Sequence, residues 1–241
     1  MNIYRCTFTG VDQKTSINRV EELSNKYPYA EWALLYSAKR QGNESKYPSY
    51  DFIADWLDVV TPSVHLALHL CGRSVQDLIN QNNSVLELVE LVQSRKGRIQ
   101  LNFNNSSKQI DIKRLVEVMK IFQDVEFITQ RNDSNIGVLE EINEYGINNH
   151  SVLFDRSGGK GIKRIDFSRP ITNPCGYAGG LSADNLYDAL KNIKRWVSEN
   201  DRIWVDMESR IRITHLDGKD WLDLNTCQEC LEKVEHFMWT L

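Results

Sequence analysis

Hydrophobic positions along the chain follow two periods that alternate with each other. Short apolar or alternating runs predict strands, and the longer amphipathic stretches between them predict helices. The predicted strands are 3–8, 31–36, 64–70, 98–103, 125–129, 151–155, 175–178 and 203–207. The predicted helices are 18–26, 50–59, 75–94, 110–122, 136–145, 185–198 and 227–238. This order favours parallel βαβ units along the whole chain.

Eight such units in 241 residues predict one (β/α)8 TIM barrel, a single domain that spans residues 1–241. An open doubly wound sheet is the alternative. The first strand, however, leads into Thr9-Gly10-Val11 and not into the G-x-G-x-x-G turn of dinucleotide-binding sheets. The barrel is therefore the preferred interpretation.

Alternation within the strands predicts which side chains enter the barrel. In the third strand the leucines of 66–70 share one face, which we expect to meet the helices and to leave His69 inside. By the same rule Asn102 and Asp155 face the interior. These polar positions lie near the carboxyl ends of their strands, where barrel enzymes place their chemistry.

Composition narrows the classes of partner. A net charge of −4 gives no general attraction to phosphate backbones, so nucleic-acid binding is not expected. No apolar run has the length of a membrane span or of a signal peptide. Five scattered cysteines suit a reduced, cytoplasmic chain better than a disulfide framework. We expect a monomer or a homodimer.

Arginine recurs after five of the predicted strands. Guanidinium groups that converge on one mouth need an anion, and a phosphorylated metabolite would supply it through bidentate hydrogen bonds. The alternative for each arginine is a solvated salt bridge on the rim. The five are Arg40, Arg73, Arg131, Arg156 and Arg210.

Two glycine-rich segments follow the sixth and seventh strands. Gly179-Gly180 leads from a strand toward a helix, where backbone N–H groups favour an anion. The other segment, Asp155-Arg156-Ser157-Gly158-Gly159-Lys160-Gly161, predicts a loop that closes over a ligand.

These segments resemble the phosphoribosylanthranilate isomerase family, TIM barrels of tryptophan biosynthesis. The residues from Leu153 to Gly161 resemble its Leu-Leu-Asp-x-x-x-Gly-Gly-x-Gly stretch, and Ala178-Gly179-Gly180-Leu181 resembles its phosphate loop. Ser37-Ala38-Lys39-Arg40 lies where the family carries Ser-x-Arg, and Val205-Asp206 begins like its last strand.

The resemblance implies an Amadori rearrangement of a phosphorylated aminoaldose to an aminoketose, with no metal and no organic cofactor. It implies Asp155 as the general acid and Cys6 as the general base. It further implies phosphate held by Gly179 and Gly180, and Arg40 and Arg210 on other anionic groups. His69, Asn102, Arg131 and Ser209 complete the candidate substrate-binding residues, because they lie at or after strand ends.

The chain also departs from the family pattern. The family's Cys-Gly pair is here Cys6-Thr7, and the histidine of its Gln-Leu-His-Gly is here Asn102. Its final Ser-Ser-Gly is here Glu208-Ser209-Arg210, so a carboxylate enters a phosphate site and needs a compensating cation such as Arg210. These changes favour a divergent member with a different substrate.

Two other functions remain open on the sequence alone. One is a Schiff-base lyase with Lys160 as nucleophile, and the other is a non-catalytic barrel that only binds its ligand. Cys227-x-x-Cys230 with His236 lies on one predicted helix without a second ligand pair, so we interpret it as structural and not as a metal site.

Overall fold

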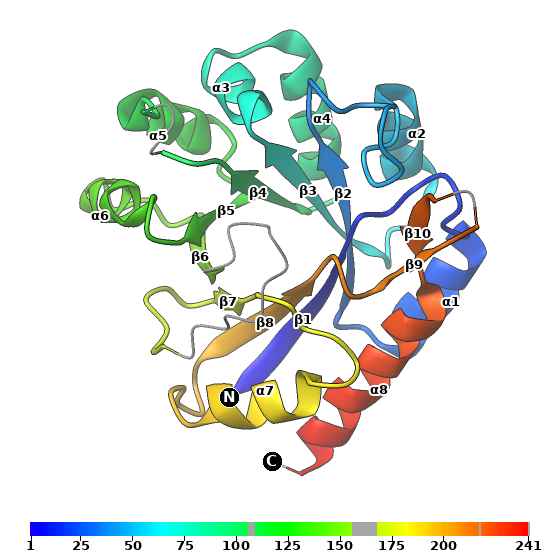
Figure 1. The fold of residues 1–241 in the computed structure, drawn as a ribbon. Coiled ribbons are helices and arrows are strands. Elements are labelled where there is room, and N and C mark those ends of the chain that lie inside the picture. The colour runs from blue at the N-terminus through cyan, green and yellow to red at the C-terminus, as the bar shows by residue number, and fades with distance from the viewer. Residues whose placement is uncertain (106–108, 156–167, 217, 241) are drawn as a thin grey trace.

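Eight parallel strands close into a barrel in the order of the sequence, as Figure 1 shows. The computed structural model describes residues 1–105, 109–155, 168–216 and 218–240. The strands are β1 (Asn2–Thr9), β2 (Ala30–Tyr36), β3 (His65–Cys71), β4 (Arg98–Asn102), β5 (Glu126–Arg131), β6 (His150–Phe154), β7 (Cys175–Tyr177) and β8 (Arg202–Met207). The predicted (β/α)8 barrel is confirmed, and every predicted strand is present.

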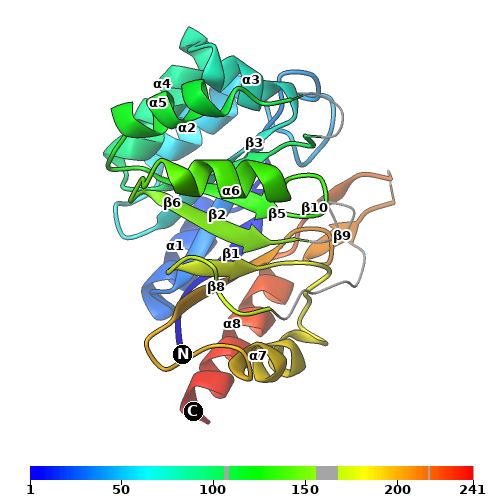
Figure 2. The same ribbon diagram turned by 90° about the vertical axis from the view of Figure 1, so that its left-hand side faces the viewer.

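Helices surround the barrel on the outside (Figures 1 and 2). They are α1 (Ile17–Lys26), α2 (Tyr50–Val59), α3 (Arg73–Ile79), α4 (Asn83–Ser94), α5 (Ile112–Ile121), α6 (Ile136–Glu144), α7 (Leu186–Lys194) and α8 (Leu224–Trp239). None of these described helices is both long and apolar enough to cross a membrane.

The predicted helix 75–94 is wrong as one element. The structure splits it into α3 and α4, because Gln81 takes a φ of 55° and interrupts the helical backbone. Asn82 then caps α4, and its side chain accepts a hydrogen bond from the Ser84 N–H.

The predicted alternation of strand side chains is confirmed where it was stated. The leucines of 66–70 lie in the apolar layer between barrel and helices, while His69 faces inward. Phe154 of β6 belongs to that outer layer, whereas Leu153 belongs to a separate small cluster inside the barrel and Asp155 lines the cavity.

A bulge in β1 decides which of its side chains enter the barrel. Ile3 pairs with Ile203 but Arg5 pairs with Trp204, so β1 carries one extra residue at Tyr4. An extra residue reverses the faces of all the residues after it. Thr7 therefore lies beside the inward Asp206, and Cys6 points outward.

Charged side chains fill the lower part of the barrel, at the amino ends of the strands. Arg98 Nε donates to Glu31 Oε2 at 2.8 Å, and both side chains are almost fully buried. Arg98 Nη2 also donates to Thr7 Oγ1, and its guanidinium carbon lies 4.5 Å from the Trp204 ring centroid. These contacts close the barrel beneath its polar upper half.

A hairpin that the sequence patterns did not predict follows β8. It consists of β9 (Arg212–Thr214) and β10 (Asp220–Leu222). Arg212 is buried in this hairpin, and its Nη2 donates to Asp12 Oδ2 at 2.9 Å in the loop after β1. The hairpin therefore fixes the loop that leaves β1 at the mouth of the barrel.

Candidate active site

A cavity opens at the carboxyl ends of the strands. Its volume is about 50 Å³, and it opens to solvent at the mouth of the barrel. The described residues that line it are His69, Gln100, Asn102, Gln130, Leu153, Asp155, Ala178, Gly179, Gly180, Leu181, Asp206, Glu208 and Ser209. The structure thus brings together six of the predicted site residues: His69, Asn102, Asp155, Gly179, Gly180 and Ser209.

Two buried carboxyl groups face this cavity. Asp155 follows β6 and accepts a hydrogen bond from Gln130 Nε2 at 3.0 Å. Asp206 lies on β8 and accepts one from Thr9 Oγ1 at 2.7 Å. Burial raises the pKa of Asp206 to about 7, and the nearby carboxyl groups of Glu208 and Asp155 contribute in the same direction. Asp206 therefore exchanges a proton near neutrality, as a general acid or base requires.

A network of neutral polar side chains forms another wall. His69 is buried, and burial lowers its pKa to about 3, so its ring is neutral. Gln100 Nε2 lies 2.9 Å from Asn102 Oδ1 and 3.3 Å from His69 Nδ1. Because the amide N–H donates in both contacts, His69 Nδ1 accepts and its proton lies on Nε2.

The Gly179-Gly180 loop has the backbone that its glycines allow. Their φ angles are 120° and 68°, values that other residues rarely adopt. Asn185 holds the loop, because its Nδ2 donates to Gly180 O and its Oδ1 accepts from Ser182 N–H, both at 2.9 Å. The loop leads into α7, whose N-terminus favours negative charge.

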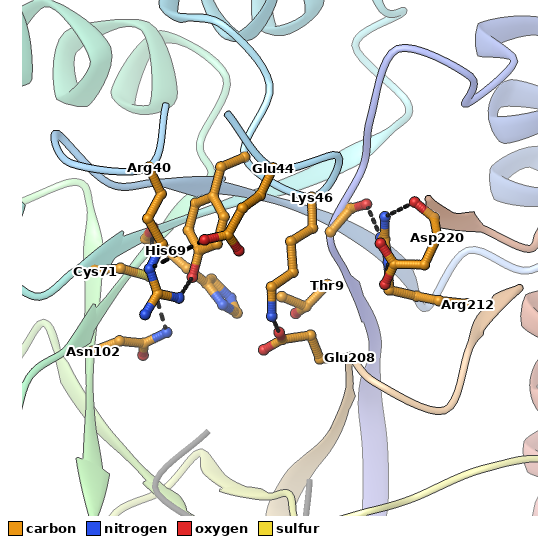
Figure 3. A network of polar contacts seen from close by, with 12 residues as sticks. Thr9, Arg40, Glu44, Lys46, His69, Cys71, Asn102, Glu208, Arg212 and Asp220 are labelled. Carbon is orange, nitrogen blue, oxygen red and sulfur yellow. Dashed lines mark hydrogen bonds and ion pairs between the residues drawn. The ribbon is translucent and has the colours of Figure 1, made fainter. Parts of the chain in front are cut away.

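Glu208 has a cationic partner, but it is not Arg210. Lys46, in the loop between β2 and α2, places its Nζ 2.6 Å from Glu208 Oε1, as Figure 3 shows. Arg210 is exposed. The expectation that Arg210 compensates this carboxylate is therefore wrong, because a lysine from the loop after β2 pairs with it.

Cys6 does not share the site with Asp155. The bulge in β1 turns it into the apolar layer toward α8, where it is fully buried among hydrophobic side chains. Burial raises the pKa of its thiol well above the usual value, and neighbouring Cys230, Asp206 and Glu31 add to the effect. A buried thiol that resists ionisation is a poor base. The structure thus places Cys6 away from the reacting groups.

The predicted arginines that the structure describes do not converge on the mouth. Arg40 lies on the rim near Cys71 and Asn102, half exposed, and donates to Tyr47 OH at 3.2 Å (Figure 3). Arg131 points outward, with its guanidinium carbon 5.3 Å from the Phe154 ring centroid. Arg73 is exposed beside Asp77 on α3. Arg156 and the candidate nucleophile Lys160 lie outside the described residues.

Several residues of the site were not among the predicted ones. Asp206 and Gln130 lie at inward positions of β8 and β5, and their alternation with Val205 and Thr129 was a usable signal. No pattern in the sequence indicates Lys46, because its contact with Glu208 depends on how the loop between β2 and α2 folds at the mouth. The inward position of the Thr9 side chain, which donates to Asp206, depends on the bulge in β1.

The fold resembles those of solved structures, whereas comparisons of the sequence find no relative. No protein-family model matches the chain, and neither does any curated protein sequence. Among solved structures, the phosphoribosyl anthranilate isomerase of Thermotoga maritima aligns with a TM-score of 0.62 at 16% identity, over 97% of this chain and 100% of that one. TrpF from Jonesia denitrificans aligns with a TM-score of 0.61 at 15% identity, over 97% and 98%.

A further phosphoribosyl anthranilate isomerase structure, in complex with reduced 1-(o-carboxyphenylamino)-1-deoxyribulose 5-phosphate, gives a TM-score of 0.61 at 15% identity, over 97% of this chain and 100% of that one. At such identities the likeness concerns the fold. This chain therefore has the (β/α)8 barrel fold seen in phosphoribosylanthranilate isomerases.

Proposed function

We propose that this chain is an isomerase that converts an aldose to a ketose in a small phosphorylated sugar amine. One observation carries the proposal. Asp155 and Asp206 face one cavity from β6 and β8, and the Gly179-Gly180 loop lines the same cavity. Two proton-transferring groups beside an anion-binding loop are the requirements of this reaction class.

In the proposed reaction Asp155 protonates the ring oxygen, and the C1–O bond breaks as the nitrogen lone pair forms a C1=N iminium. Asp206, as carboxylate, then takes the proton at C2, and the C–H electron pair forms a C1=C2 double bond while the iminium nitrogen regains its lone pair. The enol loses its hydroxyl proton and C1 gains one, which gives the aminoketose. Asp206 thus has the role that the resemblance assigned to Cys6, since its pKa of about 7 suits a base near neutrality.

The phosphate is proposed to bind at the backbone N–H groups of the Gly179-Gly180 loop. The loop and the N-terminus of α7 both favour a negative charge there. Arg40 on the rim and Lys46 beside Glu208 are described cations near the mouth (Figure 3).

Deuterium exchange tests the proposal without knowledge of the natural substrate. In D₂O we expect the protein to place deuterium at C2 of the ribosylamine 5-phosphate that forms when ribose 5-phosphate condenses with ammonia, and proton NMR measures the loss of the C2 proton signal. Asp155→Asn and Asp206→Asn should lower the exchange rate by about 10²–10⁴. Cys6→Ala is the matched control and should keep the rate. No exchange with this ribosylamine 5-phosphate would contradict the proposal.

Complementation then tests the specific reaction. Growth of a bacterium that lacks the tryptophan-pathway isomerase would identify the substrate as phosphoribosylanthranilate. Failure with soluble protein would exclude that substrate and leave the exchange result unchanged.

A further inference from the structure

Gln100 carries a buried acceptor that the protein itself does not satisfy. The residue lies on β4, its side chain is 2% exposed, and it lines the cavity. Its Oε1 has no hydrogen-bond partner among the described residues. Buried polar side-chain atoms are rarely left without a partner, so this acceptor suits a donor that a ligand supplies.

The neighbours of Gln100 fix which end of its amide remains available. Its Nε2 donates to Asn102 Oδ1 at 2.9 Å and lies 3.3 Å from His69 Nδ1. Asn102 is held in turn, because its Nδ2 donates to Cys71 Sγ at 3.7 Å. If the Gln100 amide turned round, its oxygen would lie against the oxygen of Asn102. The end of the amide that remains available is therefore the acceptor.

The size of the cavity and the need for a donor both favour a hydroxyl group. The cavity measures about 50 Å³, which admits only a few groups of the size of a water molecule. An ionised carboxylate or phosphate group has acceptors only, so it cannot satisfy Oε1. A hydroxyl is small and donates one hydrogen bond, as this position requires.

The order of the strands selects the hydroxyl at C2 of the sugar. In the closed barrel β4 lies opposite β8, four strands away in either direction. In the proposed reaction Asp206 on β8 takes the proton at C2. The hydroxyl on the same carbon projects away from that proton, and therefore toward β4 and Gln100.

We infer that Gln100 is a specificity-determining residue, whose Oε1 accepts a hydrogen bond from the C2 hydroxyl of the substrate. The inference rests on the proposed function and restricts its substrates to sugar phosphates with a hydroxyl at C2. The amide binds and orients this hydroxyl, while Asp206 moves the C2 proton. As the C1=C2 double bond forms, the hydroxyl becomes an enol and a stronger donor, so the contact strengthens as the reaction proceeds.

Three probes test the contact by calorimetry at pH 7.5. They are ribose 5-phosphate, 2-deoxyribose 5-phosphate and ribose. The hydroxyl effect is the affinity ratio between ribose 5-phosphate and its 2-deoxy analogue, and we expect about tenfold or more. The phosphate effect is the affinity ratio between ribose 5-phosphate and ribose, and it tests the anion site of the proposed function.

Variants assign the hydroxyl effect to Gln100. Gln100→Met removes the amide at nearly the same length, and Gln100→Asn withdraws the acceptor by one methylene. Each should bring the hydroxyl effect to within about threefold of unity. Each should also keep the wild-type affinity for 2-deoxyribose 5-phosphate, which shows that the variant folds. Gln123→Met makes the same exchange at an exposed position between α5 and β5 and should change neither ratio.

The outcomes separate this inference from the proposed function. A hydroxyl effect near unity in the wild-type protein overturns the inference, whereas deuterium exchange at C2 would leave the proposed function standing. A large hydroxyl effect that both Gln100 variants retain also overturns the inference. A hydroxyl effect that depends on Gln100, without deuterium exchange, supports the contact and contradicts the proposed reaction. If neither sugar phosphate binds, the inference is overturned.

Discussion

Lys46 and Glu208 join the loops that follow β2 and β8, the two strands on either side of β1, with Nζ 2.6 Å from the carboxylate oxygen. Lys46 comes from the loop after β2, and Glu208 follows β8 and lines the cavity beside Gly179 and Gly180. Each side chain is about one quarter exposed, 25% for Lys46 and 24% for Glu208. The pair thus keeps a carboxylate beside the Gly179-Gly180 loop, the proposed anion site, without leaving its charge unbalanced.

Removing either partner should change phosphate affinity in opposite directions. Lys46→Met leaves the Glu208 carboxylate uncompensated, so we expect about tenfold weaker binding of inorganic phosphate, a change of about 1.4 kcal/mol. Glu208→Gln removes a repulsive charge and should strengthen binding several-fold. Calorimetric titration with inorganic phosphate measures both.

The double variant Lys46→Met/Glu208→Gln should return to nearly the wild-type affinity, because the net charge is restored. Weaker binding in Glu208→Gln would show that the carboxylate does not oppose the anion.

Asp206 should make the folded state less stable as the pH rises. Its pKa is raised to about 7, so the stability it contributes is fully present below its unfolded pKa of about 4 and is lost as the pH rises through about 7. Asp206→Asn should therefore show a flatter free energy of unfolding between about pH 4 and about pH 7, by up to about 1.4 kcal/mol per pH unit. Urea unfolding at four pH values measures this, and parallel profiles for the two proteins would refute it.

Replacing only one partner of the buried pair Arg98–Glu31 should lower the free energy of unfolding substantially. Glu31→Gln leaves the Arg98 guanidinium buried with a weaker partner, so we expect a loss of about 3–5 kcal/mol in the free energy of unfolding. Arg98→Met/Glu31→Met replaces both charges and should recover most of that loss. A double variant at least as unstable as Glu31→Gln would contradict this, because the charges would then stabilise the barrel by more than cancelling each other.

Cys6 should be chemically silent in the folded protein. It is fully buried and its thiol pKa is raised, so alkylation by iodoacetamide should occur only after unfolding. Mass spectrometry of the protein treated with and without urea locates the modified cysteines. Rapid modification of Cys6 without urea would contradict its position behind β1.

Much of the barrel was predictable because each strand and helix has its own local pattern. The leucine face of β3 and the inward Asp155 followed from alternation alone. The outward position of Cys6 could not be predicted in this way. One extra residue at Tyr4 reverses the alternation, and nothing in an apolar–polar pattern reveals a bulge.

The prediction that arginines converge on the mouth was wrong for the described arginines, for a different reason. An arginine after a strand can lie on either face or on the rim, and its long side chain follows local partners. Arg131 lies over Phe154 on the outside, and Arg40 is held by Tyr47 and Glu44. Lys46, six residues beyond Arg40, reaches Glu208 at the edge of the cavity only because the loop after β2 folds toward the end of β8.

Carbon NMR titration of the Asp206 carboxyl, assigned with Asp206→Asn, tests the proton-transferring site most directly. We predict a midpoint near pH 7, which falls when Asp155→Asn removes a neighbouring negative charge. A midpoint near pH 4, unchanged by Asp155→Asn, would contradict the account of two coupled carboxyl groups in one cavity.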